Sequence, residues 1–297
     1  MKKTVLPLIL MIFFLVPCSV FAQQDSSLHA QIAQIAKQSK GVVGVSILGI
    51  ESRDTVNYNG NSRMVMHSVM KFPIAMTILH LVDKGKYKLD QMINVSKKDW
   101  PGNSYSPLRK KYPDGGSIAL SEFLSYMVSL SDNDACDFML KKIGGPKAVE
   151  EYIQSIGIKG IMVNASEGEM AAAWEVQYTN WCKPTEVVHL LDIFYQGKAL
   201  SKTSNDFLYK IMTETSTGPH RIKGMLPADV VVAHKTGTSP TNDAGLSPAT
   251  NDVGIITLPN GKHLAIAILI SNSTDDEATR DVVIAKIAKA AWDTYVK

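Results

Sequence analysis

The stretch HSVMKFPIAM, residues 67–76, marks the point where the hydrophobic pattern of this chain changes from strands to helices. Before it, GVVGVSILGI (41–50) and TVNYN (55–59) have the composition and length of two strands. After it, as far as about Gly218, apolar residues recur three and four positions apart, which predicts helices. Four segments have this pattern, and several of them end at a glycine: MKFPIAMTILHLVDKG (70–85), LSEFLSYMVSL (120–130), NDACDFMLKKIGG (133–145) and TEVVHLLDIFYQG (185–197).

The strand pattern returns after Pro227 in VVVAHKTGT (230–238), NDVGIITL (251–258) and HLAIAILIS (263–271). The last two are joined by a link that contains Asn260-Gly261, which is a strong hairpin signal. Both ends of the chain have helical spacing. The residues that carry it are Leu28, Ile32 and Ile35 near the N-terminus, and Ile284, Ile287, Ala288, Ala291, Trp292 and Tyr295 near the C-terminus.

Strands at both ends with helices between them predict an α/β (α+β) fold of two domains. We expect one antiparallel five-stranded sheet, flanked by the terminal helices and built from residues 23–62 and 219–297. Residues 63–218 are expected to form an inserted all-helical domain. The active site is expected in the cleft between the two domains, where ligand sites often form.

The composition is that of a folded, exported protein. With 45% hydrophobic and 20% charged residues, the chain is not disordered. A basic start, an apolar run from Val5 to Val16 and a small residue before Gln23 form a secretory signal peptide, residues 1–22, so we expect a periplasmic or secreted protein. Removal of its two lysines lowers the formal charge from +3 to +1, which leaves no footprint for nucleic acid.

The sequence contains three cysteines. Cys18 lies in the signal peptide, and its lipidation is an alternative that the preceding Pro17 disfavours. Cys136 and Cys182 remain in the mature chain, where an exported protein could join them in one bridge. Two buried thiols are the favoured interpretation, because a chain of this size does not depend on a disulfide scaffold.

Ser68 and Lys71 place a hydroxyl and an ammonium one helical turn apart on the same face. An S-x-x-K spacing is common by chance, and a solvated surface pair would explain it. Two further triplets change this interpretation: Ser131-Asp132-Asn133 lies between two predicted helices, and Lys235-Thr236-Gly237 lies on the strand after Pro227. Each alone is most often a helix cap or a strand edge, but together, in this order, they form a specific catalytic constellation.

With these elements the chain resembles the class A serine β-lactamases and the related penicillin-binding proteins over essentially its whole mature length. Three stretches are most similar to the PER, VEB and CfxA branch of extended-spectrum class A enzymes: QYTNW (177–181), TGPHRIKGMLP (217–227) and AHKTGTS (233–239). The resemblance implies hydrolysis of penicillins and cephalosporins, and hence antibiotic resistance. It implies a monomeric enzyme with no cofactor and no stable membrane association after signal cleavage.

A serine hydroxyl needs a nearby base to become a nucleophile, and Lys71 can supply one to Ser68. The resemblance assigns the two oxyanion donors to the backbone N–H groups of Ser68 and Thr238. It gives Ser131 the task of passing a proton to the departing ring nitrogen, and Asn133 that of holding the substrate's side-chain amide. Asp132 is expected to orient the turn.

The resemblance places the substrate carboxylate beside Lys235, Thr236 and Gly237, with Arg221 as a second cation. Taken alone, Arg221 would be interpreted as an ordinary surface arginine. Tyr105 is a candidate for an aromatic wall of the cleft, and a partly buried core tyrosine is an equally good interpretation.

Class A enzymes differ from penicillin-binding proteins by a glutamate that activates the deacylating water. The candidate is Glu167 in VNASEGEMAAAWEVQYTNW (163–181), and Glu169 is the second choice. Ala171 stands where the family has an Asn or a His that helps to hold this water.

The loop that carries the glutamate departs from the family in a second way. Ala165 and Asn180 replace the Arg and Asp that usually close it by a salt bridge, so the loop must be held otherwise. His67 precedes the nucleophile where many members differ, and we expect it to pack.

Three other functions fit parts of the sequence. A zinc hydrolase is disfavoured because the seven histidines show no H-E-x-x-H motif and no paired ligand spacing, so no metal site is expected. A penicillin-binding D,D-peptidase shares the acylating residues but lacks the loop glutamate. A non-hydrolytic β-lactam sensor needs a membrane-spanning transmitter, and no second apolar run reaches the roughly 20 residues of a span.

Overall fold

The computed structural model describes residues 18–100 and 104–296, with the side chains described from residue 27 onward. Most of the predicted signal peptide, residues 1–22, lies outside the described residues, and the signal peptide stays a prediction. Within the described ranges, no helix combines the length and apolar character needed to cross a membrane.

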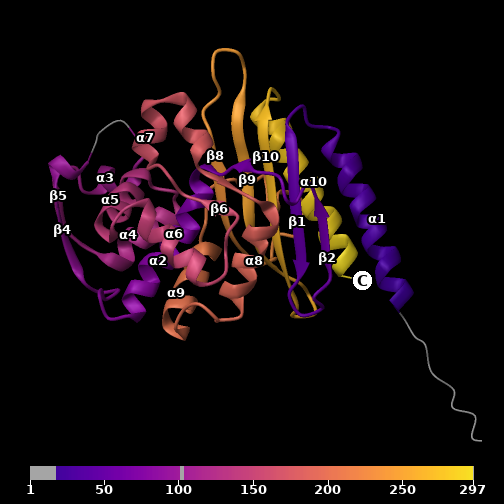
Figure 1. The fold of residues 1–297 in the computed structure, drawn as a ribbon, viewed down its shortest axis with the longest axis horizontal. Helices are drawn as coiled ribbons and strands as arrows, with labels where there is room; N and C mark the ends of the chain where they lie inside the picture. The colour runs from indigo at the N-terminus through magenta and orange to yellow at the C-terminus, as the bar shows by residue number, and fades with distance from the viewer. Residues whose placement is uncertain (1–17, 101–103, 297) are drawn as a thin grey trace, which may run out of the picture.

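A five-stranded antiparallel sheet, in the order β2-β1-β10-β9-β8, forms the centre of the fold (Figure 1). Its strands match the predicted segments: β1 (Val42–Gly49), β2 (Thr55–Tyr58), β8 (Val232–Thr238), β9 (Ser247–Thr257) and β10 (His263–Ser273). The predicted hairpin is also confirmed. Gly261 has a φ of 77°, which suits glycine in the tight turn between β9 and β10.

Two terminal helices, α1 (Cys18–Ala36) and α10 (Glu277–Tyr295), cover one face of the sheet (Figure 1). The predicted apolar stripes face it: Leu28 and Ile32 of α1 and Ile284 of α10 are fully buried against strand residues. Asp276 caps α10 by accepting a hydrogen bond from the Thr279 N–H at 2.7 Å.

The middle of the chain covers the other face of the sheet and is mostly helical, as predicted (Figure 1). Its α-helices are α2 (Lys71–Asp83), α3 (Pro107–Lys111), α4 (Leu120–Ser129), α5 (Asn133–Ile143), α6 (Pro146–Ser155), α7 (Glu167–Ala172), α8 (Pro184–Tyr195) and α9 (Lys202–Thr213). Its 3₁₀ helices are η1 (His67–Met70), η2 (Lys97–Asp99) and η3 (Trp174–Thr179). A fourth 3₁₀ helix, η4 (Ile222–Met225), lies between this middle segment and β8.

This segment also contains two small sheets that the sequence did not predict. They are formed by β3 (Met64–Val65), β7 (Trp181–Cys182) and β6 (Ile161–Met162), and by β4 (Met92–Ser96) and β5 (Gly115–Ala119).

Side-chain alternation along β8 divides its residues between the two faces of the sheet. Ala233 packs in the core shared with the helical segment, whereas Val232 packs in the core shared with the terminal helices. Lys235 therefore points to the helical side, and His234 and Thr236 point to the side of α10.

Candidate active site

Ser68 and Lys71 lie in two different helical elements. Ser68 belongs to the 3₁₀ helix η1, and Lys71 begins α2. Because a 3₁₀ helix has three residues per turn, residues three apart are aligned along it. The Lys71 Nζ atom accordingly lies 2.8 Å from the Ser68 Oγ atom, in a site where both residues are buried.

The backbone is in the left-handed region at two positions beside this pair. His67 has a φ of 45° and Ser131 a φ of 58°. Side chains other than glycine rarely adopt such angles, at a cost of about 1–3 kcal/mol each, and they cluster at functional sites. His67 precedes the predicted nucleophile, and Ser131 itself has a predicted catalytic role.

The Lys71 ammonium is surrounded by oxygen atoms. Besides Ser68, it contacts Asn133 Oδ1 at 2.6 Å, Glu167 Oε1 at 2.7 Å, and Ser131 through its carbonyl at 2.9 Å and its Oγ at 3.4 Å. An ammonium has three protons to donate. These acceptors therefore compete for its protons, so proton movement among them requires little change in geometry.

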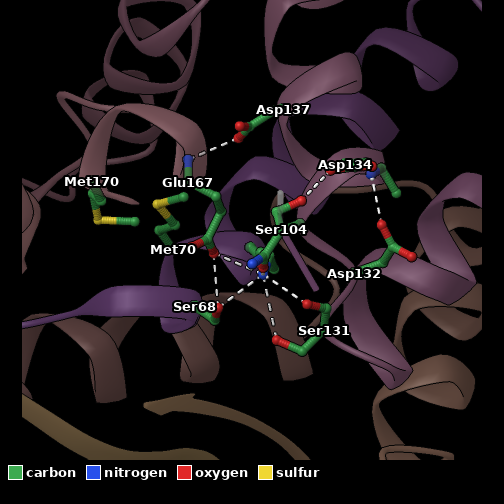
Figure 2. A network of polar contacts seen from close by, with 12 residues as sticks. Ser68, Met70, Ser104, Ser131, Asp132, Asp134, Asp137, Glu167 and Met170 are labelled. Carbon is green, nitrogen blue, oxygen red and sulfur yellow. Dashed lines mark hydrogen bonds and ion pairs between the residues drawn. The ribbon is translucent and has the colours of Figure 1, made fainter. Parts of the chain in front are cut away.

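Glu167 occupies the first position of α7 and faces the nucleophile. Its Oε1 atom accepts a hydrogen bond from Ser68 Oγ at 2.8 Å, and Figure 2 shows the two side chains pointing toward each other. Burial raises the pKa of Glu167, but the adjacent Lys71 charge and the hydrogen bonds from Lys71 and Ser68 outweigh it and hold this pKa below its ordinary value. The carboxylate can thus act as a base toward a hydroxyl or a water.

The loop that carries Glu167 is held by amide and carboxylate side chains rather than by a salt bridge. The buried Asn180 Oδ1 atom accepts from the N–H groups of Asn164 (2.7 Å) and Ala165 (2.9 Å), and its Nδ2 donates to the Ala165 carbonyl at 2.8 Å. On the other side, Asp137 accepts from the Glu167 N–H at 2.8 Å (Figure 2). It also accepts from the Gly168 N–H at 2.8 Å.

The sequence reasoning did not identify Asp137, although a signal was available. Asn133 and Asp137 are four residues apart on α5, so both face the same way. Burial raises the pKa of Asp137 to about 6, even though its two N–H donors favour the anion.

Glu169 and His67 also support this loop. Glu169 and Ser166 form a capping box at the start of α7, which gives the second-choice glutamate a role in the helix rather than beside Ser68. His67 packs as expected, and in addition its Nε2 atom lies 2.9 Å from Gln177 Oε1. Gln177 donates its amide to the Trp174 carbonyl, so its oxygen must accept from His67 Nε2–H.

The turn before α5 holds Ser131 and Asn133 in place. Asp132 is fully buried and caps α5 by accepting from the Ala135 N–H at 2.8 Å. It also accepts from Ser106 Oγ and from the Leu108 N–H at 2.6 Å, which matches the expected orienting role.

Lys235 approaches Ser131 from the sheet. Its Nζ atom lies 2.9 Å from Ser131 Oγ and 2.9 Å from the Thr236 carbonyl. Burial, followed by repulsion from Lys71, lowers the pKa of Lys235 well below its usual range. Ser131 thus stands between two buried lysines.

Gly237 allows β8 to pass close to the nucleophile. A Cβ atom at this position would lie 2.6 Å from the Met66 carbonyl oxygen and 3.1 Å from the Val69 nitrogen. Only glycine fits such an approach, which brings the backbone of Thr238 beside the segment that contains Ser68.

Arg221 is buried rather than on the surface, and it lies behind β8. Its Nε atom pairs with Asp281 of α10 at 2.7 Å, and its Nη2 atom donates to Thr238 Oγ1 at 2.8 Å. The hydroxyl of Thr236 lies 2.6 Å from that of Thr217. The arginine therefore reaches the cleft through Thr238.

A pocket of about 340 Å³ opens beside Ser68. Apolar and aromatic side chains line it together with polar groups of the site. The lining residues are His67, Ser68, Asn133, Glu167, Met170, Ala171, Trp174, Gln177, Thr238 and Pro240. Tyr105 is 55% exposed and does not line this pocket, which takes its aromatic side chain from Trp174 instead.

The two remaining cysteines, Cys136 and Cys182, are free and buried, so the favoured interpretation of two thiols is confirmed. In the described part of the chain, no group of three or more His, Cys, Asp or Glu side chains is placed to hold a metal ion.

Comparison with known proteins identifies the family. The model of the β-lactamase enzyme family matches residues 27–295. The chain belongs to this family. β-Lactamase VEB-1 of Pseudomonas aeruginosa is 38% identical, over 99% of this chain and 98% of that protein. Extended-spectrum β-lactamase PER-1 of the same organism is 42% identical, over 92% of this chain and 89% of that protein.

Among solved structures, a class A β-lactamase from Bacteroides cellulosilyticus is similar with a TM-score of 0.88 and 38% identity, covering 92% of this chain and 98% of that one. The predicted resemblance to class A serine β-lactamases, and to the VEB and PER members of the extended-spectrum branch, is confirmed. The predicted fold is confirmed as well.

Proposed function

We propose that this class A β-lactamase opens the β-lactam ring through an acyl-enzyme on Ser68, which Glu167 then helps to hydrolyse. The observation that carries the proposal is the position of the Ser68 Oγ atom. It lies 2.8 Å from both a buried ammonium, Lys71 Nζ, and a buried carboxylate, Glu167 Oε1. A hydroxyl between two such groups can lose its proton as it attacks.

Acylation can begin by either of two routes. Glu167 can accept the Ser68 proton directly, or it can first take a proton from Lys71, whose neutral amine then serves as the base. Both routes use contacts of 2.7–2.8 Å. The oxyanion that forms requires two donors, and we assign them to the N–H groups of Ser68 and Thr238, whose strand is drawn close by Gly237.

Ser131 is suited to carry a proton to the departing ring nitrogen. Its hydroxyl lies 3.4 Å from Lys71 Nζ and 2.9 Å from Lys235 Nζ, so it can be resupplied from either lysine. Asn133 uses its Oδ1 atom on Lys71, which leaves its amide N–H groups to hold a carbonyl of the substrate.

The substrate carboxylate would bind at the end of β8. Lys235 supplies the nearest charge and Thr236 a hydroxyl, both beside Gly237. Arg221 adds a second positive charge behind Thr238. We assign Tyr105 no contact in the pocket beside Ser68, although it stays a candidate for the outer cleft.

Deacylation would use a water activated by Glu167. Ala171 offers no polar side chain to that water, and we assign its binding to the carboxylate of Glu167 and the amide of Asn133, which line the same pocket. The loop contacts of Asn180 and Asp137 fix the position of the glutamate, which the missing salt bridge would otherwise leave undefined.

The test combines intact-protein mass spectrometry with the absorbance of a chromogenic cephalosporin. The wild type should hydrolyse it with only a transient adduct. Glu167→Ala should accumulate a covalent adduct while turnover falls by about 10²–10⁴-fold. A persistent adduct on the wild type would identify a penicillin-binding protein or a sensor, and normal turnover of Glu167→Ala would exclude this residue as the base.

We further propose a substrate range that includes cephalosporins as well as penicillins, on the strength of the similarity to extended-spectrum enzymes. We also propose that residues 1–22 direct export, that the enzyme is a monomer and that it has no stable membrane association. We propose a division into a sheet domain, residues 23–62 and 219–297, and a helical domain, residues 63–218.

A further inference from the structure

His67 has a backbone conformation that glycine would adopt without strain, yet an imidazole stands there. Its φ of 45° lies in the left-handed region, and its side chain is buried. The backbone just before it is held from the main sheet, because the buried Asn251 donates its amide to the carbonyls of Val65 (2.8 Å) and Met66 (3.0 Å). The sheet thus holds this turn through its backbone, which leaves the imidazole available for another contact.

The imidazole joins the turn of the nucleophile to the loop that follows Glu167. Its Nε2–H donates to the Gln177 Oε1 atom at 2.9 Å, and the Gln177 amide donates to the Trp174 carbonyl at 2.7 Å. Gln177 is only 2% exposed. Loss of the imidazole would therefore leave a buried oxygen without its donor, which favours a rearrangement of the amide and of the carbonyl that it holds.

The contact between His67 and Gln177 ties residues 173–177 to a segment outside the loop. The other hydrogen bonds of these residues, in the described part of the chain, stay within residues 169–179. Val176 packs against the hydrophobic core of the helical segment, whereas Trp174 belongs to neither core of the described residues. The position of the indole therefore depends on the carbonyl contact with Gln177, and through it on His67.

Trp174 lines the pocket beside Ser68, together with His67 and Gln177. It is partly exposed, so its ring is accessible to a ligand in that pocket. Ser68 follows His67 directly in the sequence. A short path of covalent and hydrogen bonds thus runs from the nucleophile to the indole and sets the position of one relative to the other.

We propose that His67 is a positioning residue which, through Gln177, holds Trp174 where its indole packs against the acyl side chain of the bound substrate. Trp174 then selects substrates with a flat aromatic side chain, since ring pairs gain from offset or edge-to-face packing in addition to the area that they bury. The inference rests on the proposed acyl-enzyme at Ser68, which brings the acyl group of the substrate to this pocket.

The test compares two cephalosporins that differ only in the acyl side chain, which carries an aromatic ring in one and a methyl group in the other. The readout is the ratio of their kcat/KM values, because a loss of folded enzyme or of nucleophile strength lowers both alike. Trp174→Ala should reduce the preference for the aromatic substrate about 10-fold. His67→Gly, which fits the backbone angle, should reduce it by about 3- to 10-fold. An unchanged ratio in either variant would overturn the proposal.

Two further variants separate the hydrogen bond from other effects of residue 67. His67→Gln places an amide N–H near the position of the imidazole Nε2–H, so its ratio should lie closer to that of the wild type than to that of His67→Gly. His67→Gly combined with Trp174→Ala should give the ratio of Trp174→Ala alone, because both substitutions act on the same indole. Failure of the glutamine to restore the ratio, or losses that multiply in the double variant, would refute the proposal.

Gln177→Ala breaks the same bridge from the other side if His67→Gly does not fold, and it should lower the ratio in the same direction. His263→Ala is the matched control. This partly exposed histidine begins β10, lies 2.8 Å from the Tyr195 hydroxyl and does not line the pocket beside Ser68. The control should leave the ratio unchanged, and a shift as large as that of His67→Gly would count against the proposed bridge.

These outcomes are distinguishable from failure of the proposed function. If the wild type hydrolyses neither cephalosporin and forms no adduct with them, the proposed function fails before any ratio is measured. If it hydrolyses both and the ratio is insensitive to residues 67 and 174, the function stands and this inference falls.

Discussion

Replacing Asn180 by alanine should release the loop that presents Glu167. The side chain is fully buried and makes three hydrogen bonds to the backbone at Asn164 and Ala165, with lengths of 2.7, 2.9 and 2.8 Å. Alanine removes all three. The contact between the Met66 N–H and the backbone carbonyl of residue 180 would remain.

The cost can be worked out from these contacts. Each hydrogen bond contributes about 1 kcal/mol net, and the N–H and C=O of the buried Ala165 would lose their partner, which adds about 1–3 kcal/mol. We therefore expect Asn180→Ala to lower the free energy of unfolding by about 4–6 kcal/mol, or to open the loop locally if that costs less. Glu167 lies two residues beyond Ala165, and a shift of about 1 Å would reduce turnover about 10²-fold.

Urea unfolding measures the global change, and amide hydrogen exchange over residues 164–172 measures local opening. Single-turnover mass spectrometry should reveal slower deacylation than acylation. Asn164→Ala is the matched control, because its exposed side chain makes one bond of 3.2 Å to the Thr179 carbonyl; it should cost about 0.5 kcal/mol or less. If Asn180→Ala matches this control in stability, exchange and turnover, the loop is held by something other than this amide.

Two further predictions concern Asp137 and Gly237. Because the folded pKa of Asp137 is raised to about 6 from 3.8, the folded protein holds this proton more tightly than the unfolded chain does. The free energy of unfolding of the wild type, measured with urea, should therefore fall as pH rises from about 4 to about 6. Asp137→Asn should show a smaller fall. Equal slopes in the two proteins would contradict the raised pKa of Asp137. Gly237→Ala would place its Cβ atom 2.6 Å from the Met66 carbonyl oxygen. We expect kcat/KM to drop at least about 10-fold and the free energy of unfolding to fall by about 1–3 kcal/mol. Unchanged kinetics and thermal unfolding would show that β8 can move away.

The fold was predictable where periodic patterns were long. The strands of the main sheet, the Asn260-Gly261 hairpin and the terminal helices are carried by local residue patterns, and the structure has them in the predicted places. The sheet of β3, β6 and β7 was not predictable, because strands of two residues leave no periodicity to detect. Ser68 and Lys71 were expected on one helix, but they fall in a 3₁₀ turn and the helix that follows.

The catalytic triplets were visible because each is a short motif with a fixed spacing. The side chains that hold the catalytic residues in place could not be predicted, because each of them contacts residues that are distant in the sequence. Asn180 contacts residues 15 and 16 positions away, and His67 contacts Gln177 across 110 positions. No local pattern indicates such a pair, although the departures from the family pattern at Ala165 and Asn180 did indicate that the loop needed another support.

The distribution of charge explains why such a site would select an anionic substrate. On the cleft side of the sheet, two buried ammonium groups, Lys71 and Lys235, stand against one contacting carboxylate, Glu167. Among these groups in contact the excess is one positive charge, which a single substrate carboxylate would match. The attraction of an entering anion would therefore offset the repulsion that Lys71 exerts on Lys235, and would help to keep Lys235 protonated as Ser131 draws on it.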